Sequence, residues 1–381
     1  MVYKVALVGD YPESPECVVG GVEAVLLYLS RALSQLDRFE IHVVTLDRWK
    51  RGGRQMSDGN LNVHYLKSSP LRTRLAGVDN TRRLANQLHA LRPNLIHAHA
   101  ANKYAIAASR TGLQWVLTPH GIRYQEAELH PDLLSRLYTK PLVRREERRA
   151  VASAPNLISI NPYVEECLCE NYAGTIFRIE NPVAEQFFSL EQRNEPCRLL
   201  YVGRIIPVKD IITLIKAFAI VKREHPTATL YIAGQPNFHD PYTLEVQKQI
   251  HSDGVGDSVT LLGQLDEVEL HTQFERASLV VLSSIVETAP MAIAEAMATG
   301  TAVVATDAGG SGHMIQEGRT GYLAEVGNHR AFAHCVAKAL STDPRALMMG
   351  MAARDNALTR FRESTIAKKT VEAYEAILCK P

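Results

Sequence analysis

The sequence predicts an α/β protein made of two Rossmann-like domains, each a doubly wound parallel sheet with helices on both faces. Short apolar runs rich in Val, Ile and Leu alternate with longer segments of helical periodicity along the 381 residues. Each apolar run is continuous, which is typical of parallel strands covered on both faces. The thirteen runs exceed what one ordinary doubly wound domain holds, and we therefore expect two such domains in tandem.

The expected strands fall into two series. The first comprises residues 5–8, 41–46, 63–66, 95–98, 115–118, 157–160 and 177–179, and the second comprises 199–202, 229–233, 259–262, 279–282, 302–305 and 321–324. Helical spacing of apolar residues is clearest over 22–33 and 211–221. A last helix, 364–378, has no strand after it.

The boundary between the domains is expected at 180–183, where Pro182 stops the preceding strand. We assign residues 1–183 to an N-terminal domain, 184–362 to a C-terminal domain and 363–381 to a C-terminal helix that packs back on the N-terminal domain. In open parallel sheets, ligands bind beyond the carboxyl ends of the strands. The residues that follow each strand are therefore the candidates for function.

Composition favours a cytoplasmic protein. None of the six cysteines forms a CxxC pair and no Cys/His cluster has zinc spacing, so we expect reduced thiols. The first ten residues are too quickly broken by polar residues to be a signal peptide, and no run of 18 apolar residues exists.

Charge is unevenly spread along the chain. Residues 1–183 hold 23 Lys and Arg against 18 Asp and Glu, whereas the whole chain has a net charge of +1. Bases concentrate at 48–54, 67–83 and 136–149. Each stretch alone is an ordinary solvated surface, but together they permit an anionic acceptor or peripheral contact with the inner face of a membrane. No aromatic residues interleave in a stacking pattern, so nucleic acid is not an expected partner.

Two cations follow the strand 199–202. Gly203 at the strand end lets the backbone approach a ligand, and Arg204 and Lys209 lie where a helix begins. Lone cations oppose the helix dipole at that end, and an anion such as a diphosphate between them removes the conflict. An ordinary surface turn would show the same residues.

Two carboxylates follow the strand 279–282. Pro290 suits the first turn of a helix, so that Glu287 precedes the helix and Glu295 lies inside it among Ala and Met residues. A buried carboxylate needs hydrogen-bond donors, which sugar or ribose hydroxyls would supply. The alternative is a helix-end charge and an exposed helix glutamate. A glycine-rich turn, 306–312, follows the next strand.

Together these motifs resemble the retaining glycosyltransferases of family 4. Gly203-Arg204-x4-Lys209 is followed by Glu287-x7-Glu295, which runs on into Ala296-Met297-Ala298-x-Gly300. The combination is specific although each short motif is weak. The resemblance implies the GT-B fold, in which two Rossmann-like domains face across a cleft, with the acceptor bound mainly by the N-terminal domain and the nucleotide sugar by the C-terminal domain.

The resemblance also implies the roles of individual residues. Arg204 and Lys209 would bind the donor diphosphate, Glu295 the ribose, and Glu287 the transferred sugar. His120 matches the family's active-site histidine, and His99 could contact the acceptor. Further donor contacts are expected at Gly20, Gly21, Gly203, Gln264, Leu265, Ala289, Met291 and Ala292. Without the resemblance, His120 and His99 would be read as capping or core histidines.

One position departs from the family pattern. Many members have Phe-Gly where this chain has Ala289-Pro290, and Pro290 offers no N–H to a ligand. The change affects which sugar fits rather than the reaction.

The implied reaction needs neither cofactor nor metal. Arg204, Lys209 and loop amides would stabilise the charge on the leaving diphosphate, the task that a metal performs in other transferases. We expect transfer of a hexose-type sugar, from a UDP-sugar first and a GDP-sugar next, to a glycan, lipid-linked or small-molecule hydroxyl in the synthesis of cell-surface polysaccharide or glycolipid. A sugar-nucleotide epimerase, a phosphorylase-like enzyme and a non-catalytic nucleotide-sugar-binding subunit remain as alternatives.

Overall fold

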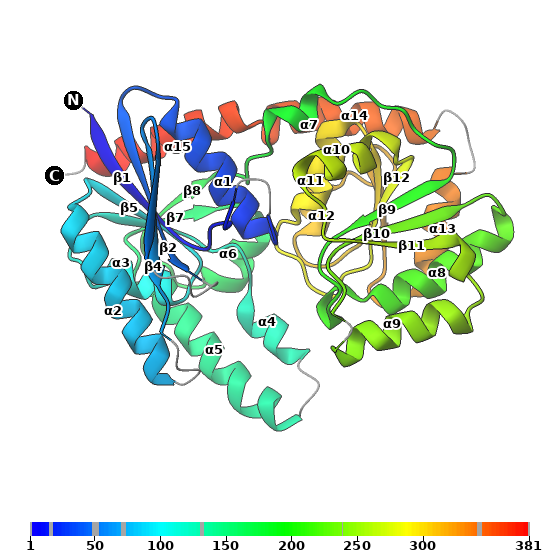
Figure 1. Cartoon of the computed structure of the whole chain (residues 1–381), viewed down its shortest axis with the longest axis horizontal. Coiled ribbons are helices and arrows are strands. Elements are labelled where there is room, and N and C mark those ends of the chain that lie inside the picture. Colours follow the sequence, from blue (N-terminus) through cyan, green and yellow to red (C-terminus); the bar gives the residue numbers. More distant parts are fainter. Residues whose placement is uncertain are drawn as a thin grey trace. The chain divides into compact units, whose positions relative to one another are not determined.

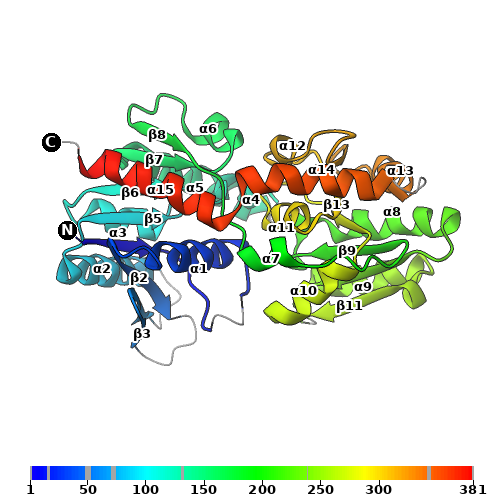
Figure 2. The ribbon, with the colours of Figure 1, turned by 90° about the horizontal axis from the view of Figure 1, so that it is seen from above.

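The computed structural model describes residues 2–14, 18–47, 53–69, 74–129, 133–237, 239–340 and 345–379. The chain divides into two compact units: unit 1 comprises Met1–Pro182 and Glu363–Pro381, and unit 2 comprises Val183–Arg362. Each unit holds one sheet flanked by helices (Figures 1 and 2). Within the described ranges no helix is both long and apolar enough to cross a bilayer.

Unit 1 contains an eight-stranded sheet in the order β3-β4-β2-β1-β5-β6-β7-β8. Its strands are β1 (Tyr3–Val8), β2 (Phe39–Asp47), β3 (Arg54–Asp58), β4 (Leu61–Lys67), β5 (Leu95–His99), β6 (Trp115–Thr118), β7 (Asn156–Ser159) and β8 (Thr175–Arg178). Its helices are α1 (Gly21–Ser34), α2 (Arg74–Leu91), α3 (Lys103–Ser109), α4 (Arg123–Glu128), α5 (Leu133–Ser153), α6 (Pro162–Leu168) and α15 (Glu363–Leu378).

The core of unit 1 includes the last helix of the chain. Leu26 of α1 and Ile366 and Tyr374 of α15 pack with Val5 and Val43 of the sheet in one apolar cluster. Removing such side chains from water is the main driving force for folding. Unit 1 is therefore completed by residues that lie beyond unit 2 in the sequence.

Unit 2 contains a six-stranded sheet in the order β11-β10-β9-β12-β13-β14. Its strands are β9 (Arg198–Val202), β10 (Thr229–Ala233), β11 (Val259–Gly263), β12 (Leu279–Leu282), β13 (Ala302–Thr306) and β14 (Gly321–Ala324), and all neighbours are parallel. Its α-helices are α7 (Glu185–Ser189), α8 (Ile211–Glu224), α9 (Pro241–Ser252), α10 (Glu267–Arg276), α11 (Met291–Thr299), α12 (Ser311–Met314), α13 (His329–Leu340) and α14 (Arg345–Arg360). Single 3₁₀ turns lie at Pro207–Lys209 and Gly256–Ser258.

The predicted parallel strands are confirmed to within two residues at their ends. The prediction missed β3, which pairs antiparallel with β4 and has exposed residues at Gln55, Met56, Ser57 and Asp58. Such a strand buries almost no side chain, so it leaves no apolar run in the sequence.

The strand order fixes where a ligand can bind in each unit. In unit 2 the order reverses between β9 and β12, and in unit 1 it reverses between β1 and β5. Pairing of β9 with β12 is recorded only at Leu199 with Leu279 and Leu200 with Val280, so their carboxyl ends are not paired. A crevice at such a switch point is the usual ligand site of a doubly wound sheet.

Candidate functional site

The loops after β9 and β12 are hydrogen-bonded to each other at the switch point of unit 2. Ser283 Oγ donates to the carbonyl oxygens of Lys209 and Asp210 at 3.0 and 2.8 Å. Ile285 N donates to Val208 O at 2.8 Å. These bonds hold two segments, far apart in sequence, in a fixed register and bring their charged side chains together.

Lys209 and Glu287 form an ion pair at this point. Lys209 Nζ lies 2.5 Å from Glu287 Oε1, and Ser284 Oγ donates to the same oxygen at 2.7 Å. Glu287 and Ser284 are buried, and the Lys209 side chain is 20% exposed. Both contacts use Oε1, and no described residue donates to Oε2, which remains available to a ligand.

Arg204 is a second cation on the loop after β9, five residues before Lys209 in the sequence. Its side chain is exposed and forms no ion pair with a described residue, while Tyr201 OH donates to its carbonyl oxygen at 3.1 Å. The backbone here is closely packed, because a Cβ on Gly234 would lie 2.0 Å from Gly203 O. Glycine at 234 therefore allows the loop after β10 to reach this edge.

Glu295 is buried on α11 and is 5% exposed. Burial raises its pKa to about 7, and among the described residues none donates a hydrogen bond to it. A buried carboxyl group without a donor is costly, so the site fits a ligand that supplies hydroxyl groups. The alternative of an exposed helix glutamate is wrong.

Pro290 lies just before α11, whereas the prediction set it within the first turn of that helix. It is the N-cap of α11, in extended conformation, rather than part of the first turn, and it supplies no side-chain cap. The amides of Met291 and Ala292 begin the helix, and amides in a first turn have no partner within the helix. They are suited to accept an anion or a sugar oxygen as ligand.

The N-terminus of α8, the helix that follows Lys209, carries a negatively charged N-cap that was not predicted from the sequence. Asp210 is the N-cap of α8, with a left-handed φ of 45°, and its carboxylate accepts from Thr213 N at 3.2 Å. Lys209 itself lies in the preceding 3₁₀ turn. The conflict between Lys209 and the helix dipole is therefore weaker than predicted, and the ion pair with Glu287 is the stronger feature.

Other predicted donor residues lie at strand ends or helix starts. Gln264 and Leu265 follow β11, two strands from β9, and Gln264 N donates to Gln235 Oε1 at 3.3 Å. Gly20 is the N-cap of α1 and Gly21 its first residue, and a Cβ on Gly20 would meet no atom within 4 Å. Their contacts with a nucleotide sugar stay predictions.

Three histidines gather at the carboxyl edge of the unit 1 sheet. His99 ends β5, and its Nδ1 lies 2.8 Å from Nε2 of His120, which follows β6. His97, on β5, is anchored at 2.6 Å to Thr118 Oγ1 and at 2.7 Å to the Tyr374 hydroxyl. The prediction named His99 and His120 but did not foresee their hydrogen bond.

Burial keeps these histidines neutral. It lowers the pKa of His97 to about 3 and that of His120 to about 4, and it lowers the pKa of His99 well below its usual value. The side chain of Asn181 opposes this effect at His120. His99 is 1% exposed, so in this arrangement it supports His120, and its contact with an acceptor stays a prediction.

The sequence interpretation missed Glu147 on α5, which holds the start of α4. Its two carboxylate oxygens accept from Arg123 N and Tyr124 N at 2.8 and 2.9 Å. Burial raises the pKa of Glu147 to about 7, against the effect of these two bonds. A cap from 24 residues away leaves no local signal.

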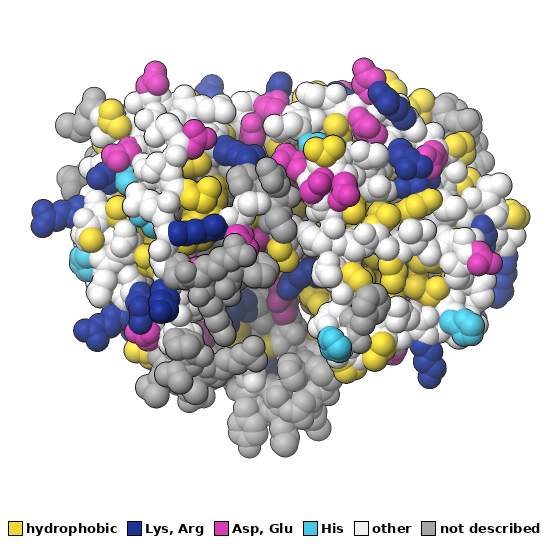
Figure 3. Space-filling model, in the orientation of Figure 1, with side chains coloured by type: hydrophobic (Ala, Val, Ile, Leu, Met, Phe, Trp, Pro, Cys, Tyr) yellow, Lys and Arg dark blue, Asp and Glu magenta, His cyan; other side chains and the backbone are white. Residues whose placement is uncertain are grey.

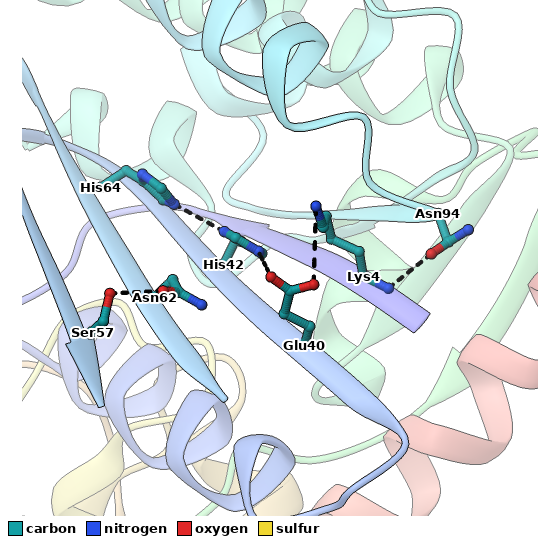
Figure 4. A network of polar contacts seen from close by, with 7 residues as sticks. All are labelled: Lys4, Glu40, His42, Ser57, Asn62, His64 and Asn94. Carbon is teal, nitrogen blue, oxygen red and sulfur yellow. Dashed lines mark hydrogen bonds and ion pairs between the residues drawn. The ribbon is translucent and has the colours of Figure 1, made fainter. Parts of the chain in front are cut away.

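A second histidine pair lies within the sheet of unit 1. His42 Nδ1 is 2.9 Å from His64 Nε2, and His42 Nε2 is 2.9 Å from Glu40 Oε1 (Figure 4). Glu40 also lies 3.9 Å from Lys4 Nζ. Both ring nitrogens of His42 are thus used inside the sheet, which makes this pair structural.

The switch-point residues of unit 2 can bind a ligand that carries both phosphate and hydroxyl groups. Arg204 and Lys209 supply positive charge, and Glu287 Oε2 and Glu295 supply acceptors for hydroxyl groups. Among the described residues, no group of three His, Cys, Asp or Glu side chains is arranged to hold a metal ion.

Two family models together match most of the chain. The model of glycosyl transferases group 1 matches residues 182–356, and the model of glycosyltransferase family 4 matches residues 19–187. The chain is 28% identical to a glycogen synthase of Mycobacterium tuberculosis over 294 residues, which are 75% of this chain and 69% of the synthase.

Solved structures resemble the whole chain. Sucrose-phosphate synthase from Thermosynechococcus elongatus aligns with a TM-score of 0.86 at 20% identity, over 98% of this chain and 99% of that one. Anabaena HepE in complex with UDP-glucose aligns with a TM-score of 0.75 at 19% identity, over 98% of this chain and 100% of that one. At these identities the likeness shows the fold.

Proposed function

The chain belongs to glycosyltransferase family 4 and has the GT-B fold, and we propose that it transfers a hexose-type sugar from a nucleoside diphosphate to an acceptor hydroxyl with retention of configuration. A uridine nucleotide is our first choice, because HepE was solved with UDP-glucose, and GDP is the second. The glycogen synthase relative supports a role in glycan synthesis, and a glycolipid is our second choice of product.

One observation carries this proposal: Lys209 and Glu287 lie 2.5 Å apart at the switch point, with Arg204 on the same loop as Lys209. A sugar nucleotide joins an anion to a ring of hydroxyls through the anomeric bond. Its diphosphate matches the two cations, and its sugar matches the free oxygen of Glu287.

In the proposed reaction the anomeric carbon loses its bond to the diphosphate oxygen and gains one to the acceptor oxygen. Arg204, Lys209 and the amides that begin α11 stabilise the charge that grows on the leaving group. The acceptor proton passes to the departing phosphate oxygen, and Glu287 stabilises the positive character of the sugar ring. The role of His120 beside the transferred sugar stays a prediction.

A thermal-shift screen against UDP-, GDP- and ADP-sugars tests the donor assignment, since a ligand that binds only the folded protein raises its Tm. Products are then identified by NMR with and without acceptors, and the anomeric coupling reports retention. Conversion of the donor without acceptor into an isomeric sugar nucleotide would support the epimerase. Tight nucleotide binding without hydrolysis or transfer would support a binding subunit.

We also propose that α5 carries the surface that contacts an anionic membrane. Lys140, Arg144, Arg145, Arg148 and Arg149 line one surface hollow of about 580 Å³. Lys140, Arg144 and Arg148 repeat every four residues, and so do Arg145 and Arg149, so the five side chains lie over about half of the helix circumference. By contrast, on the face drawn in Figure 3 the Lys and Arg side chains are interspersed with Asp and Glu.

Two of these arginines are available for binding. Lys140 pairs with Glu128 and Arg148 with Glu170, whereas Arg145 and Arg149 form no ion pair with a described residue. The stretch 67–83 is partly neutralised, because Arg83 pairs with Asp79, and residues 48–52 lie outside the described part. The third basic stretch is therefore the strongest candidate.

Sedimentation with phosphatidylglycerol vesicles tests this surface. Replacing Arg145 and Arg149 by Gln should weaken binding roughly 30-fold, since each base near an anionic bilayer contributes about 1 kcal/mol. A matched double variant of the exposed Lys216 and Lys248 in unit 2 should bind as the parent does. Equal sedimentation with neutral phosphatidylcholine, or an unchanged Arg145/Arg149 variant, would refute the assignment.

A further inference from the structure

The segment that carries His120 is short and joins two elements of unit 1. Residues 119–122 run from β6, which ends at Thr118, to α4, which begins at Arg123. Thr118 is fixed in the sheet, where it pairs with His99 of β5. Four residues span at most about 14 Å, and Pro119 has a restricted φ. The position of His120 therefore depends on where the first turn of α4 is held.

α4 contributes little of its own to that position. None of its six residues, all of which are described, is buried. Its N-cap, Ile122, is buried but offers no side-chain hydrogen bond. A helix of this length is not stable by itself, and the amides of its first turn have no partners within it. Other elements must therefore hold α4 in place.

Glu147 supplies the missing partners from α5, which lies beside α4 (Figure 1). One carboxylate oxygen accepts from Arg123 N at 2.8 Å, and the other accepts from Tyr124 N at 2.9 Å. The Glu147 residue is 0% exposed. Because two separate oxygens bind two consecutive amides, Glu147 fixes both the place and the direction of the first turn.

The remaining contacts of α4 act on its side chains. Tyr163 OH donates to Gln125 Oε1 at 2.8 Å, and the Arg144 guanidinium lies 5.2 Å from the centre of the Tyr124 ring. Such side chains can rotate without moving the backbone. Among the described residues, Glu147 is the one whose side chain binds the backbone of α4.

This arrangement costs more than an ordinary helix cap. A serine or aspartate at position 122 would satisfy a first-turn amide locally. Glu147 instead has to be desolvated, and burial raises its pKa to about 7 against the effect of its two hydrogen bonds. Ionisable groups held in this way are concentrated at functional sites. The element that Glu147 holds directly follows the segment with His120.

We propose that Glu147 is a positioning residue for His120: by holding the first two amides of α4, it fixes residues 119–122 and with them the imidazole at the carboxyl edge of the sheet. The proposal rests on the proposed function only for its effect on turnover. Glu147 has no exposed surface, so in this arrangement it contacts neither donor nor acceptor and acts only through His120.

The variant Glu147→Gln tests this role without a substrate. Its amide keeps one acceptor oxygen, while its NH2 group faces the second backbone N–H. Hydrogen exchange at the amides of Arg123 and Tyr124 should become faster, and the ring ¹⁵N signals of His120, assigned by their loss in His120→Gln, should shift. Glu146→Gln makes the same change of charge at the exposed neighbouring residue and should leave all these signals unaltered.

Turnover separates positioning from simple capping. Glu147→Gln should lower kcat about tenfold or more, because a small displacement of an active-site group is costly. Its affinity for UDP should not change, since the cations proposed to bind the diphosphate belong to unit 2. A residue that only stabilised α4 would lower the Tm and leave the kcat of the folded protein as it is, which would contradict the proposal.

The wild type offers a second test. A proton on either oxygen of Glu147 weakens the bond which that oxygen accepts, so the amide signals of Arg123 and Tyr124 should change through about pH 7. The ring signals of His120 should change with them, although the pKa of His120 itself is about 4. The charged groups acting on Glu147 are Arg123, which lowers its pKa, and Glu126, which raises it.

Unchanged His120 signals in Glu147→Gln, or amide signals that titrate while those of His120 do not, would overturn the proposal. A protein that transfers no sugar would refute the proposed function, and the spectra would still decide the role of Glu147. If Glu147→Gln does not fold, the titration of the wild type decides it.

Discussion

Lys209 has two tasks in the proposed site, which can be separated by substitution. It neutralises the buried Glu287 in the free protein, and it is proposed to bind the diphosphate. Lys209→Ala should weaken UDP binding about 10- to 100-fold, the usual range for a lost charge-assisted hydrogen bond. Calorimetry measures this, with Lys216→Ala on the exposed face of α8 as the matched control. Unchanged affinity would remove Lys209 from the phosphate site.

Glu287 should behave in the opposite way. Its proposed partner is the reacting sugar, so Glu287→Gln should lower kcat by about 100-fold or more while UDP affinity changes little. Ser284 can still donate to the amide oxygen, which keeps the side chain oriented. Glu245→Gln on α9, which is exposed, serves as the control. A variant that loses nucleotide affinity and keeps kcat would show that Glu287 binds the nucleotide.

At the scale of single residues, the sequence indicated which residues belong to the candidate site. It did not indicate how those residues contact one another. Glu295 stood out because its neighbours are small and apolar, and it is buried. The pairing of Lys209 with Glu287 could not be predicted, since it depends on hydrogen bonds from Ser283 and Ile285 that join two loops. The same holds for the bond between His99 and His120.

At the scale of the elements, α15 belongs to unit 1 although unit 2 separates it in sequence from the rest of that unit. Tyr374 is fully buried in unit 1, and its hydroxyl anchors His97. Tyr374→Ala should destabilise unit 1 by about 3–5 kcal/mol, as truncations of buried aromatic side chains do.

The measurement can be made selective for unit 1. Both tryptophans of the chain, Trp49 and Trp115, fall in residues 1–182, so their fluorescence during urea unfolding reports on unit 1. Tyr374→Phe keeps the ring and should lose only the hydrogen bond, about 1 kcal/mol. If the two variants were equally stable, the packing of α15 on unit 1 would be of no consequence.

The strands could be predicted because a strand buried on both faces of a sheet consists of a continuous run of apolar residues. β3 was missed because only its backbone is engaged, through β4, and the start of α4 was missed because Glu147 caps it from another helix. Strand pairing and helix capping between distant segments produce no local pattern of residues from which they could be predicted.

At the scale of the whole molecule, the two units should respond differently to pH. In unit 1 the folded-state pKa values of His97 and His120, about 3 and about 4, lie below the unfolded value of 6.5. As the pH falls from about 6.5 toward 4, the unfolded chain binds protons that these histidines do not, which lowers the free energy of unfolding. Glu147 of unit 1, with a folded pKa of about 7, acts in the opposite direction, but His97, His99 and His120 outnumber it.

In unit 2, Glu295 changes the free energy of unfolding with pH in the opposite direction. Its folded pKa of about 7 lies above the unfolded value of 4.5, so its stabilising contribution is complete below pH 4.5 and is lost as the pH rises through 7. Urea unfolding at pH 7.5, 6.5, 5.5 and 4.5, followed by tryptophan fluorescence for unit 1, should give a falling midpoint. A His97→Asn variant should flatten that slope, and an equal slope would contradict the histidine assignment.

The insertion of unit 2 between Pro182 and Glu363 also governs the order of events on the ribosome. Unit 2 is continuous in the chain and can fold as soon as it has emerged. Unit 1 is synthesised first, yet its core stays open until Ile366 and Tyr374 arrive, so its apolar surface must be protected during translation. We expect nascent chains stalled before residue 363 to be cleaved by protease in the first 182 residues and spared in unit 2.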